Sequence, residues 1–134
     1  MRTPSQTVGP FFSFGLCARP QNELPGGTVR LEGRVLDGGG AGVPDAMVEL
    51  WQPELGFGRC GTDGEGRFSF ALPPATRPFE VMVFARGLLK PAVTRVYLAG
   101  ADAEDATMVA ARDGDGYRFD IRMQGDDATA FFDF

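Results

Sequence analysis

The segment TVRLEGRV, residues 28–35, decides the fold. Its odd-numbered positions are apolar or glycine, and its even-numbered positions from 30 to 34 are charged. A period of two residues is typical of a β-strand that buries one face and exposes the other. The run Asp37-Gly38-Gly39-Gly40 then interrupts the alternation and predicts a turn. The chain therefore begins its regular structure with a half-buried strand.

Similar strand-like segments follow at intervals along the rest of the chain, at residues 46–51, 67–70, 79–86, 93–98, 117–123 and 129–132. Residues 79–86 are apolar on both faces, which predicts a central strand with Arg86 emerging at its end. Residues 100–111 are acidic and alanine-rich and predict a loop with a turn or two of helix. Short strands separated by Gly, Pro and Asp turns predict an all-β protein, an antiparallel β-sandwich, with Trp51 in its core.

Length and composition predict one soluble domain spanning residues 1–134. Hydrophobic residues make up 43% of the chain, and no apolar run approaches the roughly 18 residues of a membrane-spanning helix. The first residues lack the pattern of a secretory signal, so we expect a cytoplasmic protein. A net charge of −5 argues against nucleic acid as a partner, because phosphates require a basic face.

The sequence contains no histidine. Histidine is the commonest metal ligand and the commonest general base near neutral pH. Its absence excludes Ser-His-Asp and Cys-His nucleophiles and sites built on histidine-bound metal. The two cysteines, Cys17 and Cys60, are not in a metal-ligand or redox spacing, so we expect two reduced thiols.

Several motifs occur in order from one end of the chain to the other: TPSQTVGPFF (3–12), VELWQ (48–52), FARG (84–87), TRVY (94–97), YRFDIR (117–122) and FFDF (131–134). With these motifs the chain resembles the intradiol ring-cleaving dioxygenases, and the first and last motifs are the most specific. It is shorter than typical members between Trp51 and Gly61 and around residues 73–78.

The resemblance implies a β-sandwich that takes part in cleaving 3,4-dihydroxybenzoate with O₂ between its two hydroxyl-bearing carbons. In this family a ferric ion held by two tyrosinates and two histidines binds the catechol. This chain has two tyrosines, Tyr97 and Tyr117, and no histidine, so the resemblance identifies it as an alpha-type chain without metal. The iron, Fe(III), is then expected in a partner beta chain, within a larger alpha–beta oligomer.

The resemblance also implies which residues of this chain bind substrate: Thr7, Gly9 and Pro10 near the start, and Arg86 in the FARG motif. A guanidinium suits an anionic benzoate because it forms charge-assisted hydrogen bonds with a carboxylate. Without the resemblance, the residues favour a different interpretation, in which Arg86 is a strand-end arginine in a surface ion pair. Tyr97 and Tyr117 are expected in the core or an interface.

Six of the twelve phenylalanines lie near the two ends of the chain, at positions 11, 12, 14, 131, 132 and 134. Chain ends are usually polar, so these aromatic side chains predict burial against a second chain. We therefore expect residues 1–27 to form an N-terminal arm that packs on a partner. In the alternative interpretation, the last phenylalanines close the sandwich as a final strand.

Two rival functions fit parts of the sequence. A free-standing, transthyretin-like binding sandwich would use the turns around residues 33–35 and 63–68, but it would leave the N-terminal motif without a role. A diverged paralogue would assemble with a beta chain without contributing to its pocket. Arg86 distinguishes this paralogue from a pocket-forming alpha chain.

Overall fold

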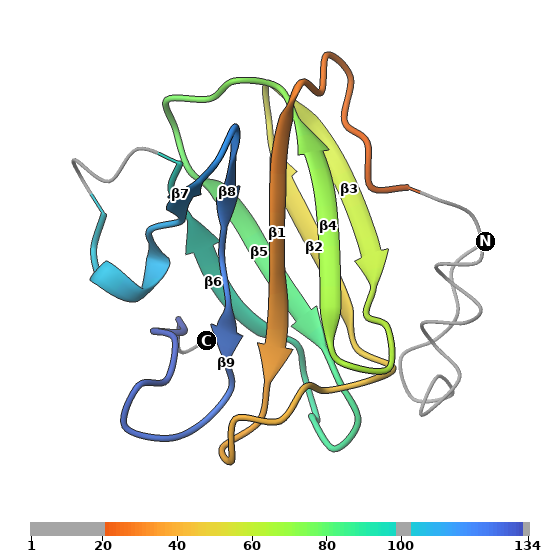
Figure 1. Ribbon diagram of the computed structural model, residues 1–134, viewed down its shortest axis with the longest axis vertical. Coiled ribbons are helices and arrows are strands. Elements are labelled where there is room, and N and C mark those ends of the chain that lie inside the picture. Colours follow the sequence, from red (N-terminus) through yellow and green to blue (C-terminus); the bar gives the residue numbers. More distant parts are fainter. Residues whose placement is uncertain (1–20, 99–102, 133–134) are drawn as a thin grey trace.

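Two β-sheets pack face to face in the computed structural model, which describes residues 21–98 and 103–132 (Figure 1). The five-stranded sheet contains, in spatial order, β4 (Arg67–Leu72), β1 (Val29–Leu36), β8 (Gly116–Arg118) and β7 (Ala111–Asp113), with β9 (Ile121–Arg122) also paired to β1. The four-stranded sheet has the order β3 (Gly56–Gly61), β2 (Met47–Gln52), β5 (Phe79–Phe84) and β6 (Ala92–Val96). This architecture confirms the predicted β-sandwich.

Side chains alternate between the core and the outside of the four-stranded sheet. Val48, Leu50 and Val81 point inward and are buried, while Glu49 and Met82 occupy the register positions between them. Strand β5 lies between β2 and β6, as predicted for a strand with two apolar faces. Trp51, however, is 47% exposed, so its predicted core position is wrong. It follows Leu50, and consecutive strand residues face opposite sides of the sheet.

The predicted strand at residues 117–123 forms two short strands that pair with β1 in parallel rather than antiparallel orientation. Between these two strands, the Asp120 carboxylate accepts the Arg34 backbone N–H at 3.0 Å. A side-chain acceptor thus replaces one backbone carbonyl in the hydrogen bonding of β1. Gly33 makes this approach possible, because a Cβ there would lie 1.8 Å from the Phe119 carbonyl oxygen.

Strand β3 is absent from the sequence prediction because three of its six residues are glycine, which lowers strand propensity. The structure requires one of these glycines: a Cβ on Gly58 would meet Leu24 at 2.6 Å. The short strand β7 was also missed, and residues 129–132 contribute a single bridge between Phe132 and Val93. Residues 106–108 form the 3-10 helix η3, in the region where a helical turn was predicted.

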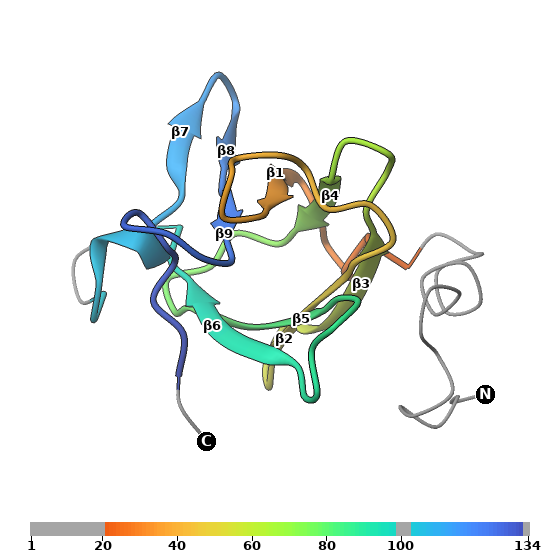
Figure 2. The same cartoon turned by 90° about the horizontal axis from the view of Figure 1, so that it is seen from below.

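Residues 21–27 close the open edge between the two sheets. The Arg59 N–H of β3 donates to the Gln21 carbonyl, and the Leu24 N–H donates to the Ala71 carbonyl of β4. Leu24 enters the core and is 2% exposed. Figure 2 shows this orange segment passing from the β4 side to the β3 side of the sandwich. The seven residues thus lie on this chain's own sheets, and packing of the arm on a partner stays a prediction.

In the described ranges, no helix is long and apolar enough to cross a membrane. Cys60 is a free thiol, as expected, whereas Cys17 lies outside the described residues.

Replacing Leu24 with alanine tests whether this segment holds the sandwich closed. The substitution should lower the free energy of unfolding by about 2–5 kcal/mol, because it removes a buried side chain and leaves a cavity. Leu89→Ala is the matched control: Leu89 is fully exposed, so we expect a change within about 0.5 kcal/mol. Urea denaturation measures both, and similar losses in the two variants would contradict a structural role for Leu24.

Candidate functional site

Arg86 lies in a tight turn directly after β5, where the sequence placed it. The Leu88 N–H donates to the Ala85 carbonyl at 3.2 Å, and Gly87 has a φ of +87°. A positive φ at the third position is the signature of a type II turn and favours glycine. The sequence Arg-Gly therefore forms a turn that leaves the Arg86 side chain projecting from the end of the sheet.

A second turn, at Pro44-Asp45, lies before β2 at the same end of the sheet. Asp45 has a φ of +59°, a left-handed conformation that Asp tolerates better than most residues. The Thr62 hydroxyl holds this turn in place: it accepts the Ala46 N–H at 2.9 Å and donates to the Val43 carbonyl at 2.8 Å. The sequence analysis identified Pro44-Asp45 as a strand boundary but missed Asp45 as a neighbour of Arg86.

Strand pairing brings these two turns together. Met47 at the start of β2 lies opposite Phe84 at the end of β5, so Asp45 and Arg86 face each other just beyond. The Arg86 Nη2 is 3.7 Å from the Asp45 Oδ2, and the two side chains are 66% and 49% exposed. Such a long, solvated ion pair contributes little to stability. The guanidinium can therefore exchange Asp45 for another carboxylate at small cost.

The other predicted substrate-binding residues, Thr7, Gly9 and Pro10, lie outside the described residues. Of the four predicted residues, the structure therefore describes Arg86 and its neighbours. Their binding role stays a prediction.

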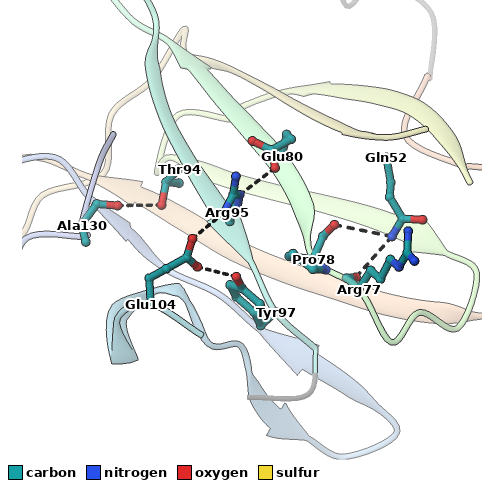
Figure 3. Close-up of polar contacts among 9 residues, drawn as sticks. All are labelled: Gln52, Arg77, Pro78, Glu80, Thr94, Arg95, Tyr97, Glu104 and Ala130. Carbon is teal, nitrogen blue, oxygen red and sulfur yellow. Dashed lines mark hydrogen bonds and ion pairs between the residues drawn. The ribbon is translucent and has the colours of Figure 1, made fainter. Parts of the chain in front are cut away.

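A cluster of charged side chains lies on the outer side of β5 and β6 (Figure 3). The Arg95 guanidinium pairs with Glu80 at 2.7 Å and also with Glu104, and the Tyr97 hydroxyl donates to Glu104. Hydrogen bonding to Glu80 raises the pKa of Arg95, and the hydrogen bond from Tyr97 lowers the pKa of Glu104. The cluster ties residue 104, just before η3, to the surface of β6.

The two tyrosines are poorly suited to hold ferric iron. Tyr97 is buried, and its hydrogen bond to Glu104 raises the pKa of the phenol, which favours the neutral form over the tyrosinate that iron requires. Tyr117 lies under the Arg112 guanidinium, 5.2 Å from the ring centre. No three His, Cys, Asp or Glu side chains gather as a metal site within residues 21–98 and 103–132. The donors present do not fit the iron site that the family resemblance describes.

A depression of about 730 Å³ is lined by residues of β1, β3, β4 and β8 and of the turn between β3 and β4, among them six charged residues and Cys60. These charges largely pair with one another: Arg67 lies 2.8 Å from Glu65, and the Arg34 Nε donates to the Glu65 carbonyl. Burial raises the pKa of the Cys60 thiol, so it favours the unreactive protonated form. Arg86, which is the predicted substrate-binding residue within the described ranges, does not line this depression.

Comparison with known proteins finds chains of protocatechuate 3,4-dioxygenases among the relatives. No family model matches the chain. The protocatechuate 3,4-dioxygenase alpha chain of Burkholderia cepacia is 35% identical, with 98% of this chain and 97% of that chain covered. The alpha chain of Pseudomonas putida is 31% identical, with 98% and 96% covered. The B. cepacia beta chain is also 31% identical, with 78% of this chain and 67% of that chain covered.

Among solved structures, the dioxygenase domain of a Streptomyces dioxygenase and carbohydrate-binding fusion protein superimposes with a TM-score of 0.60. Its sequence identity is 20%, over 79% of this chain and 88% of that chain, so the likeness shows the fold. Fold and site together define a β-sandwich subunit that presents an arginine at a strand end and lacks the donors for an iron centre. By its relatives, this chain belongs to the protocatechuate 3,4-dioxygenase alpha chains of the intradiol dioxygenase family.

Replacing Glu104 with glutamine tests the charged cluster through its pH dependence. The pKa of Glu104 is lowered, so its contribution to stability is present above the unfolded carboxyl pKa and is lost as pH falls through the folded value. The pKa of Tyr97 is raised, so the contribution of the neutral phenol is lost as pH rises through its folded value. We expect wild type to exceed Glu104→Gln in stability most clearly near neutral pH.

Thermal unfolding across a pH series measures this difference. Tyr97→Phe removes the hydroxyl alone and should reproduce the loss, and the double variant should lose less than the two single losses combined. A difference that stays constant from acid to alkaline pH would show that the hydrogen bond is not its source.

Proposed function

We propose that this chain is the metal-free alpha subunit of a protocatechuate 3,4-dioxygenase, which converts 3,4-dihydroxybenzoate and O₂ to 3-carboxy-cis,cis-muconate. The observation that carries the proposal is the match to two alpha chains over 98% of this chain, in a sequence without histidine. An active enzyme of this family needs iron, and this chain lacks the donors for it. A second kind of chain must therefore supply the iron.

The partner is a protocatechuate 3,4-dioxygenase beta chain that holds Fe(III). Hard anionic oxygen donors and imidazoles suit ferric iron, and the ion gives the bound catechol its reactivity toward oxygen. The similarity of this chain to a beta chain supports assembly of two related sandwiches, as expected for a pair that arose from one fold. The assembly works in the cytoplasm and involves neither nucleic acid nor membrane.

Within that assembly, Arg86 binds the carboxylate of the substrate at the mouth of the partner's active site. Its guanidinium projects from a rigid turn and is held by one weak ion pair, so a benzoate carboxylate can take the place of Asp45. Thr7, Gly9 and Pro10 complete this side of the pocket. Residues 1–134 form a single domain, and the N-terminal arm reaches the partner through the portion that precedes residue 21.

Co-expression of this chain with its neighbouring coding sequence tests the proposed function. Purification through a tag on this chain should yield a coloured complex that contains ferric iron and consumes oxygen when protocatechuate is added. A well-folded, colourless protein that captures no second chain would contradict the proposal and favour a free-standing binding sandwich.

Arg86→Ala tests the binding role in the assembled enzyme. The variant should assemble normally, but substrate binding should weaken by roughly 2–5 kcal/mol if the guanidinium pairs with the carboxylate in a desolvated site. Steady-state oxygen uptake measures the change in KM. Arg77→Ala is the control, because Arg77 is also exposed and also ion-paired, with Glu54 at 3.6 Å. An unchanged KM in Arg86→Ala would identify a structural paralogue without a pocket role.

A further inference from the structure

Backbone contacts hold Asp45 beside Arg86. The Thr62 hydroxyl donates to the Val43 carbonyl and accepts the Ala46 N–H, so it binds the chain on both sides of Asp45. The Thr62 N–H also donates to the Ala46 carbonyl at 2.9 Å. These three hydrogen bonds fix the backbone of residue 45 at a φ of +59°. The position of Asp45 therefore does not depend on its ion pair with Arg86.

The Asp45 carboxylate acts on Arg86 through its charge. The Arg86 Nη2 lies 3.7 Å from the Asp45 Oδ2, beyond the roughly 3.2 Å limit of an N–H···O hydrogen bond. The pair thus uses none of the N–H donors of the guanidinium, which stay available to a ligand. The nearby negative charge nevertheless reduces the attraction of the guanidinium for a second carboxylate.

The proposed reaction increases the negative charge of the molecule that Arg86 binds. Protocatechuate carries one carboxylate, and cleavage with O₂ between the two hydroxyl-bearing carbons converts each of them into another. The product, 3-carboxy-cis,cis-muconate, therefore carries three carboxylates, including the one that contacts Arg86 in the proposed complex. An arginine without an opposing charge would hold this product more tightly than the substrate. Product release limits the turnover of many enzymes, so such tight binding is unfavourable.

We propose that Asp45 is a positioning residue for Arg86, whose negative charge limits how tightly the arginine holds the carboxylate of substrate and product. The inference rests on the proposed function, because it concerns regulation of the same pocket. The closed form of an exposed ion pair is favoured over the separated form by a factor of about 1.4–5. A carboxylate that binds Arg86 must overcome this factor, so Asp45 lowers its affinity about two- to fivefold.

Asp45→Asn tests the charge alone, because Asn is similar in shape and also tolerates a positive φ. The complex obtained by co-expression is titrated with protocatechuate without oxygen, so that the ligand binds without ring cleavage, and the absorption of the ferric ion reports binding. The dissociation constant should fall about two- to fivefold relative to wild type. Catechol lacks the carboxylate, so its dissociation constant should be the same in both proteins.

Two further measurements address the product and the turn. Added 3-carboxy-cis,cis-muconate should inhibit oxygen uptake by Asp45→Asn at about two- to fivefold lower concentration than it inhibits wild type. Asp45→Gly removes the same charge in a residue that readily adopts a positive φ, so it should reproduce the tighter binding of protocatechuate. Agreement between the two variants assigns the effect to the charge and not to the shape of the new side chain.

Glu54→Gln is the matched control. Glu54 follows β2, whereas Asp45 precedes it, so the two residues lie at opposite ends of the strand. Glu54 also forms a long, exposed ion pair, with the Arg77 Nη1 at 3.6 Å. The control therefore changes the net charge of the chain by the same amount, but it should leave the dissociation constants of protocatechuate and catechol unchanged.

Two results would overturn the inference: a dissociation constant for protocatechuate that does not fall in Asp45→Asn, or an equal gain in affinity for catechol. The same titrations separate the two proposals. A complex that contains no iron or binds no protocatechuate refutes the proposed function. An iron-loaded complex that binds protocatechuate equally well with Asp or Asn at position 45 refutes the role of Asp45 alone.

Discussion

The antiparallel pairing of β2 with β5 is the constraint on which the other features depend. Its register aligns Met47 with Phe84 and Trp51 with Glu80. Because side chains alternate along a strand, a slip of one residue would exchange the buried and exposed faces of the whole sheet. The apolar positions at Val48, Leu50 and Val81 prevent such a slip, since they fill the space between the sheets.

The registers of β2 with its two neighbours define both ends of the four-stranded sheet. At one end, the pairing with β5 brings the Asp45 turn beside the Arg86 turn, and each turn has a residue with positive φ that fixes its direction. At the other end, the pairing with β3 places the exposed Trp51 opposite Phe57. A rigid centre with projecting ends suits a subunit whose proposed work is to present side chains to another chain. The paired strands β2 and β5 fix where the two turns lie, and the turns carry the charged side chains Asp45 and Arg86.

The ion pairs on β6 differ in strength from the ion pair at the end of β5. The hydrogen bond to Glu104 stabilises the neutral form of the Tyr97 phenol. The Arg95 guanidinium forms ion pairs with both Glu80 and Glu104. These groups organise the surface of β6 around the segment before η3. Arg86, in contrast, has a distant and solvated partner. The close ion pairs on β6 thus contrast with the weak pair at the strand end, which leaves the Arg86 guanidinium accessible to a ligand.

The sequence by itself determined the sandwich, the central position of β5 and the place of Arg86, because each depends on local alternation and turn residues. The motifs spread along the chain also identified the family, and the absence of histidine predicted that the iron belongs to a partner chain. The tertiary structure decided what depends on distant contacts. Gly58 of β3 leaves room for the Leu24 side chain, and the Asp120 carboxylate between β8 and β9 accepts the backbone N–H of Arg34 in β1. The register of β2 with β5 determines that Trp51 faces outward and that Asp45 lies opposite Arg86. This register depends on contacts between residues that are distant in the sequence, so no local pattern encodes it.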